Sequence, residues 1–303
     1  MGRHYSLLYF ILYSICIVGL LSTAFTILNI NKIIHWEETI DFGDYSLSVR
    51  DWGKGDPTVI IEGGLNQYKH KYFLISFFTS GITRTIAYDH AGVGDSTQNH
   101  DPRTLPNFVE ELRILMKKKK LNPPYILIGH SSGGHIIRYY TYLYPEEVAG
   151  LIFIDSPPED WFKYIRENWN KEVYQKYFKW WYPEDPDMSN IKIVERLQYE
   201  SNCDLLRGKT IPETIPVLMF TGNNVRHFRK DEAGKKADMK AWAAMQYSLV
   251  KNLDDANQIV DPGIGHYPFK DKPVMVINEI NGFVKKIKNT WHKPAGLGRS
   301  TAN

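Results

Sequence analysis

Short runs of apolar and β-branched residues recur along this chain, and they constrain its fold more than any other feature. Residues 58–61, for example, read Thr-Val-Ile-Ile. Runs of this kind are typical of strands that are buried on both faces of a sheet. Segments with helical periodicity separate most of them, and that alternation predicts an α/β fold with a mostly parallel, doubly wound sheet. The other runs lie at 85–88, 125–128, 151–154, 217–220 and 258–260.

One long segment interrupts this alternation. Residues 157–207 contain no clear buried strand. They begin just beyond the carboxyl end of the run at 151–154, the edge where open α/β sheets bind ligands. We therefore expect a helical cap over a site, although packed surface helices would leave the same pattern. Many of the side chains are aromatic: Trp161, Phe162, Tyr164, Trp169, Tyr174, Tyr177, Phe178, Trp180, Trp181, Tyr182 and Tyr199.

The N-terminal segment, residues 1–34, is predicted to be a transmembrane helix. Its residues 6–30 are almost wholly apolar and carry no charge, and a helix needs about 20 such residues to cross a membrane. We therefore expect a membrane localisation through a single-pass N-terminal anchor. The alternative is a cleaved signal peptide, with Ser22 and Ala24 before the cut, which would leave a secreted protein. The rest of the chain divides into core 35–156, cap 157–207, core 208–288 and tail 289–303.

Composition excludes several classes of function. The formal net charge is +3 over 303 residues and no basic stripe stands out, so we expect no nucleic-acid partner. The two cysteines are Cys16, inside the apolar segment, and Cys203, and no Cys/His cluster has the spacing of a metal site. We therefore expect no structural metal, and any chemistry has to come from serine, histidine and carboxylate side chains.

Residues 129–133 read Gly-His-Ser-Ser-Gly and fit the G-x-S-x-G pattern of a nucleophile elbow. The pattern alone is weak, but here it follows the predicted strand at 125–128 and precedes a helical run, which is the setting it requires. Ser131 lies between the two glycines, which leave room where strand and helix pack. Ser132 has no glycine two residues before it. The pattern therefore predicts Ser131 as the nucleophile.

A serine hydroxyl is a poor nucleophile near neutral pH and needs a neighbouring base. His266 follows the last predicted strand, at 258–260, and precedes an amphipathic helix, so its loop can bring the imidazole over the elbow. His70, His90 and His100 precede the serine, against the chain order serine, acid, histidine that accompanies this kind of elbow. We therefore predict that His266 is the base.

The imidazole needs a carboxylate to orient it and to stabilise its charged form. Asp155 directly follows the predicted strand at 151–154, whereas no carboxylate follows 217–220 until Asp231. A residue at a strand end is held in place by the sheet. We therefore favour Asp155 as the acid and keep Asp231 as the alternative.

The charge that develops on the substrate oxygen needs two backbone N–H groups to bind it. One is expected from Ser132, the residue after the predicted nucleophile. The second is expected from Leu65, because residues 62–66 read Glu-Gly-Gly-Leu-Asn directly after a predicted strand. Their glycines allow the backbone to approach closely.

Four segments together resemble the α/β-hydrolase superfamily, in its cap-bearing serine hydrolase branch. The resemblance spans residues 39–288 and implies a Ser-acid-His hydrolase without a metal or an organic cofactor. Two positions depart from the family. Gly63-Gly64 replace its usual His-Gly, and Val225 stands where it usually carries the acid, which favours Asp155. The four segments, in the family's order, are 62–65 (Glu-Gly-Gly-Leu), 89–96 (Asp-His-Ala-Gly-Val-Gly-Asp-Ser), 129–133 and 263–266 (Gly-Ile-Gly-His).

The expected function is hydrolysis of a carboxylic ester or related acyl compound through an acyl-enzyme on Ser131, with a small acyl molecule as substrate. An aminopeptidase of the proline type would share the fold and the triad, but the loop at 62–66 does not resemble that group's proline-bearing version. A non-catalytic binding protein on a hydrolase fold is the other alternative, and the presence of Ser131 and His266 argues against it. The sequence leaves the identity of the substrate and the oligomeric state open.

Overall fold

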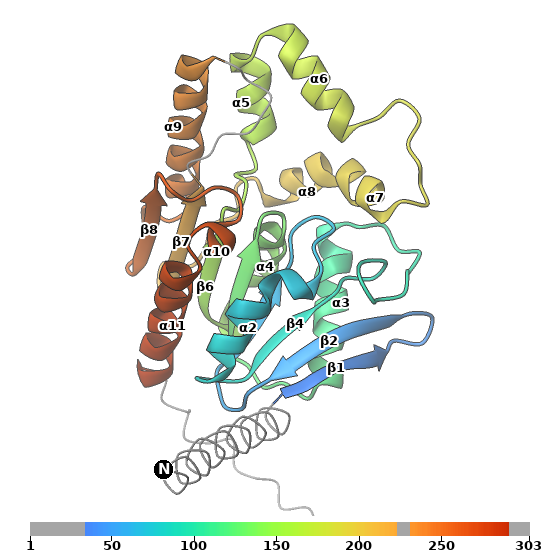
Figure 1. Cartoon of the computed structure of the whole chain (residues 1–303), viewed down its shortest axis with the longest axis vertical. Helices are drawn as coiled ribbons and strands as arrows, with labels where there is room; N and C mark the ends of the chain where they lie inside the picture. Colours follow the sequence, from blue (N-terminus) through green and yellow to red (C-terminus); the bar gives the residue numbers. More distant parts are fainter. Residues whose placement is uncertain (1–33, 223–230, 291–303) are drawn as a thin grey trace, which may run out of the picture.

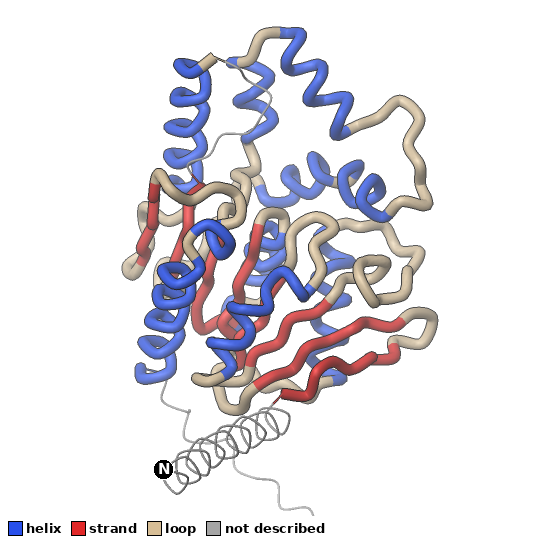
Figure 2. The backbone as a smooth tube through the Cα atoms, in the orientation of Figure 1, coloured by secondary structure: helices blue, strands red, loops and turns tan. Residues whose placement is uncertain are grey.

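The computed structural model describes residues 34–222 and 231–290 and has one central sheet (Figures 1 and 2). Its described strands are β1 (Ile34–Asp41), β2 (Ser46–Trp52), β3 (Thr58–Glu62), β4 (Thr85–Tyr88), β5 (Tyr125–His130), β6 (Val148–Ile154), β7 (Val217–Gly222) and β8 (Ala256–Asp261). They lie in the order β1-β2-β4-β3-β5-β6-β7-β8. Strands β3 to β8 are parallel, while β1 and β2 pair antiparallel at one edge. The predicted mostly parallel sheet is confirmed.

Helices cover both faces of this sheet (Figure 1). The helices outside the segment between β6 and β7 are η1 (Lys69–Tyr72), α2 (Phe73–Ser80), α3 (Leu105–Lys118), α4 (Gly133–Leu143), η2 (Pro145–Glu147), α9 (Glu232–Ser248), α10 (Pro268–Asp271) and α11 (Pro273–Thr290). Apolar residues of α2 and α11 pack in one layer, and those of α3 and α4 pack in the other. On β5, Ile126 and Ile128 are buried in the first layer and Leu127 in the second. Because both faces are covered, the strands need apolar residues at successive positions, which explains the uninterrupted runs.

Helices α5 (Trp161–Asn168), α6 (Lys171–Trp181), α7 (Ile191–Leu197) and α8 (Tyr199–Leu206) lie between β6 and β7 in the chain. We call these helices the cap. They sit beyond the carboxyl ends of the parallel strands (Figure 1). Their apolar side chains form a separate small core, so much of the cap is held together by its own aromatic residues. The boundaries 157–207 stay a prediction.

The predicted membrane anchor is not supported. Within 34–222 and 231–290, no helix is both long enough and apolar enough to cross a membrane. This finding contradicts the predicted single-pass membrane localisation, which we withdraw without assigning another. The prediction depended on the hydropathy of residues 6–30 alone, and those residues, where the transmembrane helix or signal peptide was predicted, lie outside the described chain. Residues 291–303 of the predicted tail lie outside it too.

Candidate active site

Ser131 lies at the turn between β5 and α4, with a φ of 53° in the left-handed region that few non-glycine residues adopt. Its backbone N–H donates to the carbonyl oxygen of Ile154, 3.0 Å away at the end of the neighbouring strand. The turn also needs glycine on its helix side, because a Cβ on Gly133 would lie 2.4 Å from the carbonyl oxygen of Glu62. A strained, closely packed turn of this kind presents its hydroxyl above the sheet edge.

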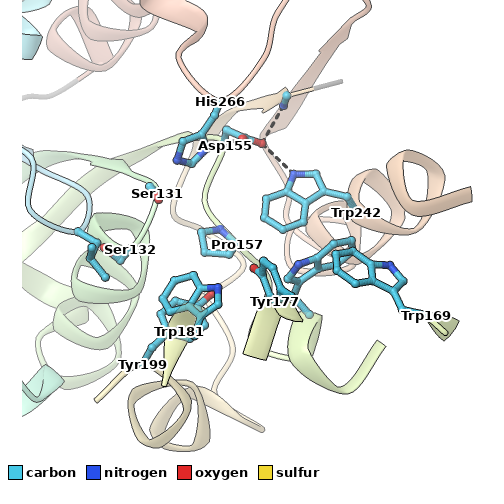
Figure 3. Close-up of a pocket in the computed structure, with 13 residues that line it drawn as sticks. Ser131, Ser132, Asp155, Pro157, Trp169, Tyr177, Trp181, Tyr199, Trp242 and His266 are labelled. Carbon is cyan, nitrogen blue, oxygen red and sulfur yellow. Dashed lines mark hydrogen bonds and ion pairs between the residues drawn. The ribbon is translucent and has the colours of Figure 1, made fainter. Parts of the chain in front are cut away.

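Asp155 directly follows β6 and is also held in the left-handed region, with a φ of 43°. Its buried carboxylate meets three donors from the described residues. Oδ2 lies 2.7 Å from Nδ1 of His266, while Oδ1 accepts from the Gly222 N–H at 2.9 Å and from Nε1 of Trp242 at 2.8 Å (Figure 3). An ionised carboxylate can only accept, so Nδ1 of His266 carries the hydrogen and its Nε2 is left as an acceptor.

A second histidine holds the backbone of His266, in the loop after β8. Nε2 of His130 lies 2.8 Å from the carbonyl oxygen of His266, and its Nδ1 lies 2.9 Å from the Tyr72 hydroxyl. That hydroxyl also accepts from the Gly64 N–H at 3.2 Å. Burial raises the pKa of Tyr72, so its hydroxyl stays protonated. The elbow, the loop at 62–66 and the histidine loop are therefore joined by one chain of hydrogen bonds.

The two predicted oxyanion donors, Leu65 and Ser132, line the same pocket as Ser131 and His266. In the part of the chain that the structure describes, neither of their backbone amides donates to another protein group. Gly64 lets the loop approach the elbow, because a Cβ there would lie 2.8 Å from the Cβ of Ser131. Both amides are therefore available to an oxygen atom bound beside Ser131.

The pocket beside Ser131 holds about 760 Å³ of space between atoms, part of which is open to solvent. Figure 3 shows the elbow and His266 on one side of it and a group of aromatic rings on the other. Among its described lining residues, only Asp155 and His266 are of types that carry charge near neutral pH. The aromatic lining residues are Trp161, Trp169, Tyr177, Trp181, Tyr199 and, from α9, Trp242.

Several contacts of the site were not predicted from the sequence. Trp242 lies 87 residues from Asp155 and outside the aromatic segment, and its position in a helix does not distinguish it from a core tryptophan. Tyr72 reaches the site through His130 and the Gly64 N–H. The sequence also does not separate Trp181, which lines the pocket, from Trp180, which is 46% exposed. Only the orientation of α6 separates those two neighbours.

The other candidate residues lie elsewhere. Asp231 caps α9, where its Oδ1 accepts from the Gly234 N–H at 2.6 Å, and it does not line the pocket. Nε2 of His90 lies 2.8 Å from Oε2 of Glu62. Burial is the largest single influence on the pKa of His90 and lowers it, but the hydrogen bond to Glu62 and the charges of Glu62 and Glu111 together raise that pKa overall. Val225, at the family's usual acid position, lies outside the described residues.

Some known proteins are similar to this chain in sequence, and others are similar to it in fold. A family model of the alpha/beta hydrolase fold matches residues 57–186. A serine hydrolase-like protein of Mus musculus is 25% identical over 223 residues, 71% of this chain and 63% of that one. A bifunctional esterase/perhydrolase of Acinetobacter calcoaceticus is 28% identical over 118 residues, 36% of this chain and 40% of that one. The chain thus spans less than two thirds of either relative.

Among solved structures, a putative lipase from Acinetobacter baumannii AYE superposes with a TM-score of 0.56 at 19% identity, over 86% of this chain and 93% of that one. At this level of identity the likeness concerns the fold alone. The fold that the two share places a strand-to-helix turn at the carboxyl edge of the sheet, where Ser131 lies in this chain.

Proposed function

Because the chain belongs to the α/β-hydrolase superfamily, we propose that it is a serine hydrolase that cleaves a carboxylic ester through an acyl-enzyme on Ser131. The observation that carries this proposal is the 2.7 Å contact between Asp155 and His266 in a pocket that Ser131 also lines. A serine, a histidine and a carboxylate that line one pocket are the groups that acyl transfer through an activated hydroxyl requires.

The proposed reaction has two halves. Oγ of Ser131 attacks the acyl carbon while Nε2 of His266 takes its proton, and Asp155 stabilises the imidazolium that forms. The substrate oxygen becomes negative and accepts hydrogen bonds from the amides of Leu65 and Ser132. The bond to the alcohol then breaks and His266 protonates the departing oxygen. Water then gives a proton to the same imidazole and attacks the acyl carbon. The bond to Oγ of Ser131 breaks, His266 returns the proton to that oxygen, and the acid leaves.

The lining of the pocket supports an uncharged substrate with an apolar group next to the reacting bond. Aromatic rings from the cap and α9 cover the side that faces Ser131, and such rings bury apolar surface effectively. An aminopeptidase has to bind a free ammonium group, for which a carboxylate is the usual partner. Among the described residues that line this pocket only Asp155 offers one, and its two oxygens already meet three donors. Glu195 faces the adjoining cavity, where it accepts from the Asn66 N–H. We therefore favour an ester over an aminoacyl substrate.

Labelling by a fluorophosphonate tests the proposal. The wild-type protein should bind one equivalent covalently at Ser131 and should hydrolyse p-nitrophenyl esters. Ser131→Ala should lose both properties while keeping its melting temperature. Ser132→Ala is the matched control, because only its backbone amide has a proposed role, and it should still be labelled. A wild-type protein that folds but takes up no label would be a binding protein on a hydrolase fold.

A further inference from the structure

A buried carboxylate of the cap lies against the loop that carries Leu65. Glu195 is on α7, four residues after Ile191, and therefore on the same side of that helix. A Cβ on Gly92, in the core, would lie 3.2 Å from the Ile191 side chain, so this side of α7 faces the core. Glu195 is only 6% exposed. A glutamate in such a place is uncommon, because burying a charged group costs free energy unless hydrogen bonds compensate it.

The hydrogen-bond partner of Glu195 is the backbone of the oxyanion loop. Oε2 accepts from the N–H of Asn66 at 2.7 Å. Asn66 directly follows Leu65 and has a φ of 51°, so the chain turns sharply there. The Asn66 N–H lies in the Leu65–Asn66 peptide, and the Leu65 N–H lies in the preceding Gly64–Leu65 peptide. The two peptides share the Cα of Leu65, so a bond that fixes the first restricts the position and tilt of the second. The carboxylate therefore acts one residue away from a proposed oxyanion donor.

The attachment of the cap to the core does not explain why Glu195 is buried, because another side chain of the cap already links the two. Asn202 on α8 accepts from the Leu105 N–H at 2.8 Å and donates to the Arg103 carbonyl oxygen at 3.1 Å. In contrast, Oε1 of Glu195 has no hydrogen-bond partner within the described chain. Glu195 also lines a second, smaller cavity together with Leu65 and Ser132, the two proposed donors. Its one strong contact is the one that orients the loop.

We propose that Glu195 is a positioning residue for the oxyanion hole: by holding the Asn66 amide, it orients the Leu65 amide only when α7 is seated on the core. This inference rests on the proposed serine hydrolase function. It makes the cap a part of the reaction as well as a wall of the pocket. Loss of the contact should weaken stabilisation of the transition state and leave ground-state binding in the aromatic pocket unchanged, so kcat should fall at nearly constant KM.

Two substitutions separate the hydrogen bond from the charge. Glu195→Leu removes the acceptor at similar volume and should lower kcat about 10- to 100-fold, less than the loss of a whole oxyanion donor. Glu195→Gln keeps an oxygen that can accept from Asn66 and should stay within about threefold of wild type. Glu200→Leu is the matched cap control, because the contacts of Glu200 with other described residues are an ion pair with Arg166 and a hydrogen bond from its backbone N–H to the Tyr182 hydroxyl. It should keep wild-type kcat.

A boronic acid analogue of the substrate gives a second readout. Its tetrahedral adduct places an oxygen in the oxyanion hole, so Glu195→Leu should raise its Ki by the factor by which kcat falls, and a merely destabilised cap would instead raise KM. If Leu is not tolerated at this buried position, Glu195→Met removes the same acceptor with a more flexible side chain. Unchanged kcat in the apolar variant, or an equal loss in Glu195→Gln, would overturn the proposal.

Fluorophosphonate labelling keeps this test separate from that of the proposed function. Glu195→Leu should still be labelled to one equivalent, only more slowly, because Ser131 and His266 are unchanged. If the wild-type protein itself takes up no label, the serine hydrolase proposal fails and Glu195 is not at issue. If labelling of wild type and Glu195→Leu proceeds at the same rate, the serine hydrolase stands and the role of Glu195 is refuted.

Discussion

The two sides of the pocket are built by different means. On the sheet side, Ser131 and Asp155 are held by their own backbones, each at positive φ just after a strand. On the cap side, rings hold one another: Trp161 stacks on Tyr164 at 5.1 Å between centroids and meets Trp242 edge-on at 4.9 Å. Reacting groups need positions accurate to about 0.5 Å, which a sheet can supply, whereas packed side chains of similar volume can replace one another. Sheet-side changes should therefore alter the rate, and cap-side changes the choice of substrate.

Among changes on the sheet side, Asp155→Asn is expected to lower the rate most. The amide cannot stabilise the charged imidazole, and its NH2 group would face a donor whichever way it turned, His266 on one side or Gly222 and Trp242 on the other. We expect kcat for a p-nitrophenyl ester to fall about 10³- to 10⁴-fold with little change in KM.

Asp231→Asn is the matched control for that substitution. Asp231 caps α9 through Gly234, and Asn is nearly as good a cap as Asp, so stability should change by less than about 1 kcal/mol. Turnover should stay within about twofold of wild type. If instead kcat collapsed in Asp231→Asn and stayed near normal in Asp155→Asn, the acid would have been assigned to the wrong strand end.

The next largest effect is expected on stability, and it comes from His135, which lies where the sheet side meets the cap side. This buried histidine on α4 lies with Nε2 2.7 Å from the carbonyl oxygen of Pro157, where the chain leaves the sheet for the cap. Burial, assisted by Arg138, lowers the pKa of His135 from 6.5 to about 4. Because the unfolded chain binds this proton at higher pH than the folded one, stability is lost as pH falls from 6.5 towards 4.

Between pH 7 and pH 5, this histidine should lower the free energy of unfolding by about 2 kcal/mol. Urea denaturation at the two pH values measures the loss, and His135→Gln, which does not titrate, isolates it. The variant should show a loss smaller by that amount. Parallel pH dependence in the two proteins would mean that other groups dominate acid destabilisation.

A smaller effect is expected from Trp242→Phe, because Trp242 joins the two sides. Its indole N–H donates to Asp155 while its ring lines the pocket. Phenylalanine keeps most of the ring but removes a donor to a carboxylate, and we expect kcat to fall about tenfold. Trp161→Phe is the matched control, since Trp161 lines the same pocket without an indole bond to the acid, and it should retain kcat. An equal fall of kcat in the two variants would mean that packing, and not the hydrogen bond to Asp155, causes the loss.

The smallest effect on rate, but a distinct one on selectivity, is expected from Trp181→Ala. Trp181 lines the pocket, so its removal should change the relative kcat/KM of short and long acyl esters about three- to tenfold. Trp180→Ala changes the neighbouring side chain, which is exposed and lies beneath the Arg196 guanidinium. Its selectivity should match wild type. A fall in melting temperature with unchanged selectivity in Trp181→Ala would make that ring a core residue of the cap only.

Local patterns in the sequence were enough to predict the sheet and the placing of several candidate residues. The runs at 58–61 and 125–128 are almost wholly apolar because both faces of β3 and β5 are covered, and that cause is visible in the residues themselves. Ser131 and Asp155 each directly follow such a strand or its turn, so the topology alone brings them to one edge. Their catalytic roles stay predictions. Hydropathy alone, in contrast, led to the membrane localisation that we have withdrawn.

Contacts between distant segments were decided only by the tertiary structure. Trp242 reaches Asp155 across 87 residues, and Glu195 reaches Asn66 across 129. In the sequence, the first is an ordinary helical tryptophan and the second an ordinary helical glutamate. Local periodicity reports which side of a helix is buried, but it does not report what that side faces. The packing of α7 and α9 against the strand ends determines that, and with it the surroundings of the candidate acid and of the oxyanion loop.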